Sequence, residues 1–383
     1  MALHFSKAEF ERRKTALCAS MAARRLDGML LFSQESMFWL TGYDTFGFCF
    51  FQSLIVAADG RMALLTRSAD LRQAQHTSLL QDIHIWRDGQ TAPPAQDLFA
   101  MAAGMGLEGK RLGVEYESHG LVAANGRRLD AAFEGRATLV EASDVVTRLR
   151  SVKSAEEIAH VRKAARLSDE ADAAALSTIR AGVDEGAVLA AQQGAVFAGG
   201  GDYPANEFII GSGRDALLCR YKSGRRVLDR RDQITLEFAG VYRHYHAAIM
   251  RTVPVGEPSP LHVTYHAAAR QALLACEEAM RPGKTAGDVF AAHAKALDEA
   301  GLSQHRLNAC GYSLGAKFTP SWMDWPMFHE DNEWVLQPGM VMFAHMILMD
   351  SDSGTAMCLG RTSLITHTMP EVLNMPSLDL ACR

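Results

Sequence analysis

The stretch that decides the fold is SVKSAEEIAHVRKAARLSDEA, residues 151–171. Ser154 is followed three residues later by Glu157, which is the capping-box pattern of a helix N-terminus. Apolar residues then recur at helical spacing among charged ones, so a long amphipathic helix is predicted over residues 154–181. The chain before this stretch differs in pattern from the chain after it, and we place a domain boundary near residue 150.

Before the boundary, helical patterns alternate with short apolar runs of strand type. Helices are predicted at residues 6–25, 96–105 and 121–132, and strands at 26–32, 83–86, 111–114 and 138–141. Asp59-Gly60 joins two further apolar runs and predicts a hairpin, since both residues tolerate positive φ. Residues 1–150 are therefore expected to form an α/β domain.

After the boundary, long helices alternate with strands and hairpins. Besides residues 154–181, helical patterns cover residues 185–198, 260–280 and 286–300. The runs between them are rich in apolar and aromatic residues, which favours strands. Residues 151–383 are expected to form a second domain of mixed α and β structure.

The amino-acid composition of the chain limits the kinds of molecule that it is expected to bind. The chain has 383 residues, 48% of them hydrophobic and 22% charged, which suits a globular protein of two or three domains. A formal net charge of −5 gives no general attraction to nucleic acid or anionic lipid. No signal peptide or long apolar span is evident, and the seven scattered cysteines contain no C-x-x-C pair. We expect a cytoplasmic protein with a small-molecule partner and neither a membrane nor a nucleic-acid partner.

Five segments resemble, in order, the superfamily of aminopeptidase P, prolidase and creatinase. Besides residues 151–171 they are GSGRDALLCRYKSGRRVL (211–228), ITLEFAGVYRHYHAAIMRTVPVGEPS (234–259), NACGYSLGAKFTP (308–320) and VLQPGMVMFAHMILMDSDSGTAMCLGRTSLITHT (335–368). MFWLTGYDTFGFCFFQSLIV (37–56) is similar to an N-terminal-domain loop of creatinase-type members. The resemblance implies an N-terminal creatinase-like α/β domain (1–150), a C-terminal pita-bread catalytic domain (151–383) and a homodimer.

The resemblance also indicates what became of the family metal site. Peptidases of this superfamily hold two divalent ions with five residues, and these positions fall on Glu237, Ala248, Tyr312, His345 and either Gly360 or Arg361. Two dications need several carboxylates to offset their charge and their lost hydration. One acidic residue among five cannot supply them, so we expect no dinuclear centre and no cofactor.

The superfamily has metal-free branches, creatinase and the ectoine hydrolases, which cleave non-peptide carbon–nitrogen bonds in small zwitterions. LEFAGVYRHYHAAIMRT (236–252) looks similar to the ectoine-hydrolase branch. Arg220, Met250 and Phe50 stand where creatinase has its His, Glu and Arg, which argues against creatine as substrate. The resemblance implies a metal-independent hydrolase of a small amidine or amide. The alternatives are a peptidase or lyase with one metal on Glu237, His246 and His345, and a non-catalytic binding protein.

Four residues are predicted to be catalytic. Glu237 would be the nucleophile or general base, because a carboxylate inside an apolar strand needs a partner or a task; the alternative is a structural ion pair with Arg251 or Arg220. His246 or His345 would transfer the proton to the leaving nitrogen, unless they are surface and core histidines respectively. Tyr312, in a turn between glycines, would donate a hydrogen bond to the substrate or only pack.

Seven further residues are predicted to bind substrate. Arg220 would hold a carboxylate in its planar fork, unless it is an exposed loop residue. In an ideal strand His244 shares a face with His246, and Tyr245 shares the other with Arg243, so one pair would line the cavity. Arg361 is a candidate because the alignment of the last family metal ligand could be shifted by one residue from Gly360. Trp322 would form a wall or pack, and Tyr43 and Phe48 would cap a neighbouring subunit's site or fill the N-terminal core.

Overall fold

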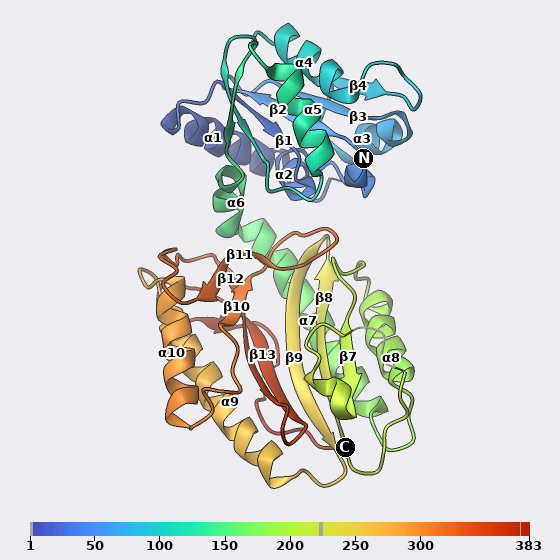
Figure 1. The fold of residues 1–383 in the computed structure, drawn as a ribbon, viewed down its shortest axis with the longest axis vertical. Coiled ribbons are helices and arrows are strands. Elements are labelled where there is room, and N and C mark those ends of the chain that lie inside the picture. Colours follow the sequence, from blue (N-terminus) through green and yellow to red (C-terminus); the bar gives the residue numbers. More distant parts are fainter. Residues whose placement is uncertain (1–2, 222–224, 376) are drawn as a thin grey trace. The chain divides into compact units, whose positions relative to one another are not determined.

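The chain divides into two compact units, Met1–Arg150 and Ser151–Arg383. The structure is a computed structural model and describes residues 3–221, 225–375 and 377–383. Each unit is a mixed α/β structure built on one sheet (Figure 1).

The N-terminal unit has a six-stranded sheet in the order β4-β3-β2-β1-β5-β6. Its strands are β1 (Gly28–Leu31), β2 (Ser53–Ala57), β3 (Met62–Arg67), β4 (Ile83–Trp86), β5 (Arg111–Val114) and β6 (Thr138–Glu141). The predicted hairpin joins β2 to β3, with Gly60 at a φ of 85°. Along β1, Met29 and Leu31 enter one hydrophobic cluster while Leu30 enters another, so both faces of the sheet are buried.

Helices cover both faces of this sheet. They are α1 (Lys7–Ala23), α2 (Gln34–Thr41), α3 (Leu71–Thr77), α4 (Pro94–Gly104), α5 (Ala123–Phe133) and α6 (Asp144–Ser151). Helix α2 is not among the helices that the sequence pattern predicts. Every residue of that helix is buried, so it lacks the exposed polar face from which helical periodicity is recognised.

The C-terminal unit has an eight-stranded sheet in which β11-β10-β12-β13-β9-β8-β7 are neighbours and β14 pairs with β13. The strands are β7 (Ile209–Ser212), β8 (Asp232–Tyr242), β9 (Tyr245–Val255), β10 (Ala309–Ser313), β11 (Asp324–His329), β12 (Val341–Asp350), β13 (Thr355–Leu364) and β14 (Glu371–Val372). All of the pairings in this sheet are antiparallel among the described residues.

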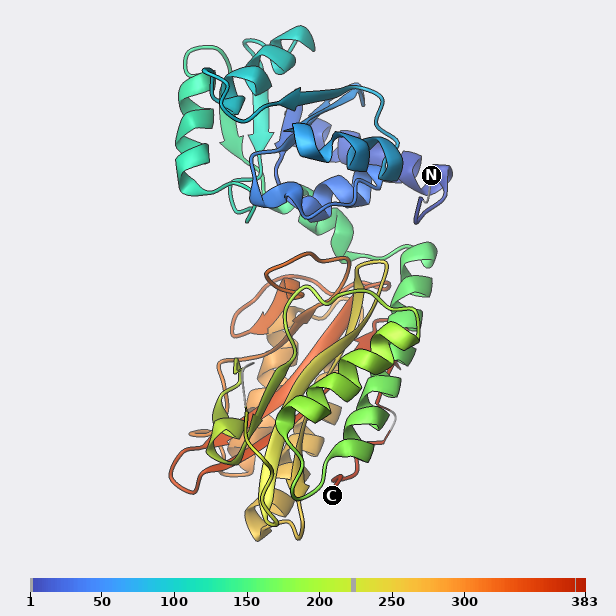
Figure 2. The same cartoon turned by 90° about the vertical axis from the view of Figure 1, so that its right-hand side faces the viewer.

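Two pairs of helices pack against this sheet. The first pair is α7 (Ala155–Thr178) and α8 (Glu185–Ala198), and α7 lies on β8 and β9; Figure 2 shows both helices in green along the strands. The second pair is α9 (Pro260–Ala279) and α10 (Ala286–Glu299), and α9 lies on β12 and β13. The predicted capping box is present, because Ser154 and Glu157 each accept the other's backbone N–H.

Alternation along the strands separates a helix face of this sheet from an open face. On the helix side, a Cβ added at Gly240 would lie 2.0 Å from the Ala164 carbonyl oxygen of α7. Arg361 of β13 likewise bonds Glu277 of α9. Glu237, an odd number of residues from Gly240 along β8, therefore points to the open face.

The segment predicted as one alternating run at residues 242–246 contains a tight turn instead. Strand β8 ends at Tyr242 and β9 begins at Tyr245, and these two residues are paired. Arg243 and His244 between them have φ of 50° and 66°, which is the conformation of a type I′ hairpin turn. Strand alternation is therefore interrupted at His244, and the prediction that it shares a strand face with His246 is wrong.

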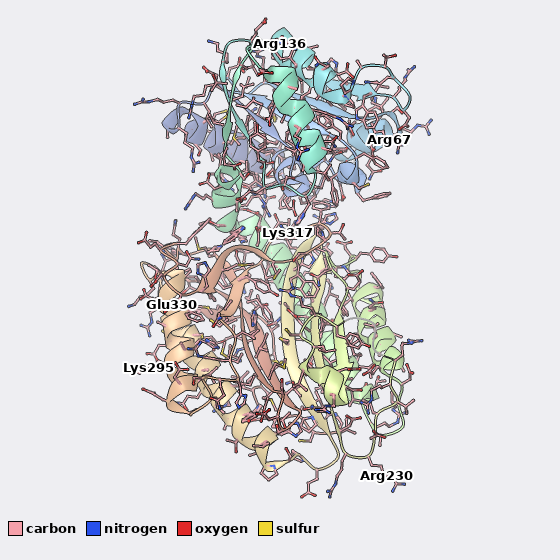
Figure 3. All side chains as sticks on the ribbon, in the orientation of Figure 1. Arg67, Arg136, Arg230, Lys295, Lys317 and Glu330 are labelled. Carbon is pink, nitrogen blue, oxygen red and sulfur yellow. The ribbon has the colours of Figure 1, made fainter. Side chains whose placement is uncertain are left out.

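Charged side chains such as Arg136 in the N-terminal unit and Lys295 and Arg230 in the C-terminal unit extend outward from the ribbon (Figure 3). The helices of the described part of the chain include none with both the length and the apolar character needed to cross a membrane.

Candidate active site

A row of paired residues crosses the open face of the C-terminal sheet. Glu237 of β8 pairs with Ile209 of β7 and with Met250 of β9. Met250 pairs with Gly360 of β13, which in turn pairs with His345 of β12. Directly paired residues point to the same face of a sheet, so Glu237 and His345 share the face that the helices leave open.

A cavity of about 400 Å³ lies on this face. Five of the predicted residues line it, from three strands and two loops: Arg220, Glu237, Tyr312, Trp322 and His345. The open face of the sheet thus brings together side chains up to 125 positions apart in the chain.

Glu237 is the acidic residue of the row and is 7% exposed. Its Oε1 accepts a hydrogen bond from the Tyr312 hydroxyl at 2.8 Å. Burial raises the pKa of Glu237 to about 7, against the opposing effects of the Tyr312 bond and the positive charge of Arg220. The ion pair with Arg251 is not formed, because Arg251 points to the helix face and bonds Asp172 of α7 at 2.7 Å. Glu237 is therefore a carboxyl group that can change protonation state near neutral pH.

Tyr312 and Trp322 extend the polar contact from Glu237 into the wall of the cavity. The Trp322 indole N–H donates to the Tyr312 oxygen at 3.0 Å. Burial is the main cause that raises the pKa of Tyr312 well above its ordinary value, so the phenol stays protonated and acts as a donor. Trp322 is itself 1% exposed and forms part of the cavity wall.

His345 lines the cavity as a neutral imidazole. Burial lowers the pKa of His345 to about 3, and the nearby positive charges of His293 and Arg220 lower it further. Its Nδ1 is buried without a hydrogen-bond partner among the described residues. The ring lies 5.5 Å from that of Tyr312. His345 can therefore donate or accept one hydrogen bond but is a weak base at neutral pH.

Arg220 follows a short 3-10 helix, η3 (Gly213–Leu217), and is exposed at the cavity. Its positive charge lowers the pKa of Glu237, Tyr312 and His345, which line the same cavity. This position suits the predicted contact with a substrate carboxylate, which remains a prediction.

His246 lies on the open face but outside the cavity. Its Nε2 accepts the backbone N–H of Ala205 at 3.0 Å, and its Nδ1 lies 3.4 Å from the Gly315 carbonyl oxygen. The residue is fully buried, and burial lowers its pKa to about 3. Both ring nitrogens are engaged by backbone, so the structure corrects the prediction that His246 transfers a proton.

Three predicted binding residues, Tyr245, Arg361 and His244, are not among the residues that line the cavity. The Tyr245 hydroxyl donates to Glu157 of α7 at 2.7 Å, on the helix face. Arg361 lies on that face too, where it forms a two-bond ion pair with Glu277 at 2.7 and 2.8 Å. His244, in the turn, stacks on Phe318 with ring centroids 4.2 Å apart. These contacts correct the predictions for Tyr245 and Arg361 and identify Gly360 as the residue of the row. The contact of His244 with substrate stays a prediction.

Tyr43 belongs to the core of the N-terminal unit. It is fully buried, and its hydroxyl lies 3.1 Å from Thr66 Oγ1 and 3.3 Å from Gln52 Oε1. The core alternative therefore holds for Tyr43, and the prediction that it caps a partner's site is corrected. Phe48 is half-buried in the 3-10 helix η1 (Gly47–Cys49), and its contact with a second subunit remains a prediction.

Several lining residues were not predicted. Asn206 and Glu207 precede β7, Cys219 precedes Arg220, and Met327 and Ile347 supply apolar wall. The signal that could have found Asn206 and Glu207 is their place directly before the strand that pairs with Glu237.

The donor set does not fit two divalent ions. The family's five ligand positions carry one carboxylate, Glu237, while the row holds Gly360 at another position. Within the described ranges, no group of three or more His, Cys, Asp or Glu side chains could hold a metal ion. The alternative of one metal ion on Glu237, His246 and His345 also lacks a donor. The Nε2 lone pair of His246 already accepts a backbone N–H.

Comparisons with known proteins agree with this architecture. The ectoine hydrolase of Halomonas elongata is 26% identical over 392 residues, covering 97% of this chain and 97% of that protein. The Xaa-Pro dipeptidase of Pyrococcus furiosus is 29% identical over 199 residues, or 52% of this chain and 56% of that protein. Among solved structures, the dipeptidase PepE from Mycobacterium ulcerans has a TM-score of 0.86 at 25% identity and covers 99% of both chains. The prolidase from Thermococcus sibiricus has a TM-score of 0.88 at 18% identity, covering 98% of this chain and 99% of that chain.

Two family matches span most of the sequence. Residues 13–152 match the creatinase/prolidase N-terminal domain, and residues 159–367 match metallopeptidase family M24. The predicted fold class, a creatinase-like α/β domain followed by a pita-bread domain, is confirmed. The chain belongs to the hydrolases of metallopeptidase family M24 and carries the creatinase/prolidase type of N-terminal domain.

Proposed function

We propose that the protein is a metal-independent hydrolase that cleaves a non-peptide carbon–nitrogen bond in a small zwitterionic amidine or amide, with ectoine-like compounds first. The observation that carries this proposal is Glu237, a buried carboxyl group that opens on a cavity and has a pKa near neutrality. A general base is most effective when its pKa lies close to the working pH.

The donor set of the cavity and one relative support this class of reaction. Glu237 is a lone carboxylate where the peptidases need several, which favours chemistry by side chains over chemistry by a pair of metal ions. The ectoine hydrolase of Halomonas elongata is similar over 97% of this chain, whereas the Pyrococcus dipeptidase is similar over 52%. The exposed cation of Arg220 at the same cavity suits a substrate that carries a carboxylate.

The reaction begins from ionised Glu237 by either of two routes. As a base, the carboxylate takes a proton from water while the water oxygen bonds to the electrophilic carbon. The carbon–nitrogen bond then breaks, its electron pair goes to nitrogen, and that nitrogen takes up the proton held by Glu237. As a nucleophile, the carboxylate itself bonds to the carbon, the carbon–nitrogen bond breaks with its electron pair going to nitrogen, and that nitrogen takes a proton from water. The hydroxide that remains attacks the acyl carbon, the bond to Glu237 breaks, and the free carboxylate returns.

The neighbours of Glu237 have separate tasks in this scheme. Tyr312 holds Oε1 by its hydroxyl proton. Neutral His345 lies across the cavity and would orient the substrate by a hydrogen bond, since its low pKa makes it a poor proton carrier. Arg220 would bind the carboxylate of the substrate and place the reactive carbon against Glu237.

A substrate panel with metal analysis tests the proposal. Protein dialysed against EDTA is incubated with ectoine, creatine and Xaa-Pro dipeptides, and its metal content is measured by plasma mass spectrometry. We expect ectoine to be hydrolysed equally well with and without chelator, and Glu237→Gln to lower kcat by at least about 100-fold. The matched control is Glu257→Gln, which changes an exposed carboxylate that follows β9.

The other outcomes identify the competing functions. Dipeptide hydrolysis that disappears with chelator and returns with stoichiometric metal would establish a metallopeptidase. Calorimetric binding of a panel compound with no turnover, in wild type and Glu237→Gln alike, would establish a binding protein.

A further inference from the structure

The hydrogen bonds around the Tyr312 oxygen have one possible direction. That oxygen lies 3.0 Å from Trp322 Nε1 and 2.8 Å from Glu237 Oε1. An indole N–H can only donate, and a phenol has a single proton. Trp322 must therefore donate to Tyr312, and the Tyr312 proton must point at Glu237 whenever Glu237 is ionised, since a carboxylate can only accept.

This direction determines which oxygen of Glu237 meets the substrate. Oε1 is occupied by Tyr312, and the structure contains no hydrogen bond to Oε2 from any residue it describes. Donation by Trp322 also makes the Tyr312 hydroxyl a stronger donor, because hydrogen bonds in a chain polarise one another. The carboxylate is thereby held at one end with the other free for reaction.

Trp322 is itself fixed in place. Its backbone N–H donates to Asn206 Oδ1 at 3.0 Å, and the backbone N–H of neighbouring Ala205 donates to His246 Nε2 at 3.0 Å. The Trp322 ring also packs against Phe208, with ring centroids 6.5 Å apart. A buried chain of contacts thus runs from β9 through the cavity wall to the reactive carboxyl group.

We propose that Trp322 is a positioning residue for Glu237 that acts through Tyr312, by directing the single Tyr312 proton at Oε1. The proposal rests on the role of Glu237 in the proposed function. It assigns Trp322 a task beyond forming the wall of a pocket, and it assigns His246 the task of anchoring the segment that holds Trp322.

Removing the indole donor while keeping an aromatic ring gives the first test. With ectoine as substrate, Trp322→Phe should lower kcat by about 3- to 10-fold, with KM little changed, because one hydrogen bond is lost. The acid limb of the pH profile should move to higher pH, since a carboxylate with a weaker donor is harder to ionise. Tyr312→Phe should shift the limb further in the same direction.

The double variant separates action through Tyr312 from direct contact with substrate. Trp322→Phe combined with Tyr312→Phe should behave like Tyr312→Phe alone. Trp325→Phe, which alters a 47% exposed indole of β11 outside the cavity, is the matched control and should leave the profile unchanged. Equal losses from Trp322→Phe in the presence and absence of the Tyr312 hydroxyl would overturn the proposal.

A second test uses NMR and requires no turnover. The Trp322→Phe variant serves only to assign the signal, and the titrations are made on proteins that keep Trp322. The five tryptophans give indole N–H signals in a ¹H–¹⁵N TROSY spectrum, and the Trp322 signal is the one that Trp322→Phe removes. We expect this signal to shift with pH as Glu237 ionises, and the shift to disappear in Glu237→Gln and in Tyr312→Phe. An unchanged pH-dependent shift in Glu237→Gln would contradict the proposal, whatever the substrate panel shows.

Other groups near Glu237 must be separated from it in this titration. Ile209 of β7 and Met250 of β9 are apolar neighbours. The titratable or charged groups are Glu207 before β7, Tyr312 of β10, His345 of β12, Cys358 of β13, and Cys219 and Arg220 after η3. Glu207→Gln serves as the control for the second carboxylate of the cavity. Burial lowers the pKa of His345 to about 3 and raises that of Cys358, which removes both from the neutral range. Cys219→Ser then serves as the control for the remaining thiol.

Discussion

At the scale of single residues, the protonation of Glu237 governs the expected activity. Both routes to carbon–nitrogen cleavage start from the carboxylate, and burial raises the pKa of Glu237 to about 7. We predict that kcat/KM for ectoine rises with pH along a limb with its midpoint near 7, which a pH-rate profile of the free enzyme checks. A limb with its midpoint near the ordinary glutamate value would mean that another group controls the reaction.

The same carboxyl group links stability to pH. A raised pKa in the folded state stabilises the protein fully below the unfolded value of 4.5, and this contribution is lost as pH rises through about 7. Relative to Glu237→Gln, the free energy of unfolding of wild type should therefore fall by up to about 3 kcal/mol over that interval. Urea titrations of both proteins at several pH values measure the difference, in which other buried carboxyl groups such as Glu115 cancel. A constant difference would show that Glu237 does not titrate there.

The proposed function gives Arg220 the task of binding the carboxylate of the substrate. Replacing Arg220 by Met removes the cation and keeps an apolar side chain of similar reach. We predict that KM for ectoine rises by about 10-fold or more, as expected when a charge-assisted hydrogen bond is lost. Steady-state kinetics checks this, with Arg214→Met of η3 as the control. A rise of equal size for an analogue without the carboxylate would contradict the assigned contact.

At the scale of elements, the packing of β8 on α7 requires glycine at position 240. A Cβ added there would lie 2.0 Å from the Ala164 carbonyl oxygen and 2.4 Å from the Ser168 nitrogen, so the strand must move away from the helix. We predict that Gly240→Ala lowers the free energy of unfolding by about 3 kcal/mol.

Urea unfolding followed by circular dichroism measures the effect of Gly240→Ala. The matched control is Gly194→Ala, at an exposed position of α8 where an added Cβ meets nothing within 4 Å. That control should be neutral or stabilising by up to about 1 kcal/mol, since alanine favours helix. Equal effects of the two substitutions would show that the contact with α7 is not restrictive.

Local patterns predicted the elements better than the contacts between them. The capping box at Ser154 and the Asp59-Gly60 hairpin depend on neighbours in the chain and are present in the structure. Gly360 and Arg361 could not be told apart by spacing, because a shift of one residue moves a side chain to the other face of a sheet. Alternation along residues 242–246 also failed to predict the side-chain directions, because Arg243 and His244 have positive φ and form a turn where a continuous strand was expected.

At the scale of the whole molecule, the resemblance to the superfamily predicts a homodimer. Sedimentation velocity should give a species of about twice the 41.8 kDa chain mass, with Phe48 near the partner's cavity. Phe48→Ala should then raise KM without a change in the fold, as monitored by circular dichroism. A monomer with full activity would exclude a site completed by a second subunit.

Part of the candidate site in the C-terminal unit could be predicted from the sequence, and part could not. In the C-terminal unit, Glu237, Tyr312 and His345 could be located because they stand at positions of known chemistry in a series of ordered segments. The bond from Trp322 to Tyr312 could not be predicted, because it depends on the path of a loop that has no periodic pattern.

The pairing of Gly360 with His345 leaves little room for the family's glutamate at position 360. A Cβ at position 360 would lie 2.8 Å from the Ala344 carbonyl oxygen and 2.8 Å from His345 Cβ, so a glutamate at this position requires the two strands to shift. The neighbouring strand would have to move first, and each intermediate sequence would carry the cost of that movement. A protein engineer who wished to return two metal ions to this scaffold would therefore have to redesign β12 and β13 together.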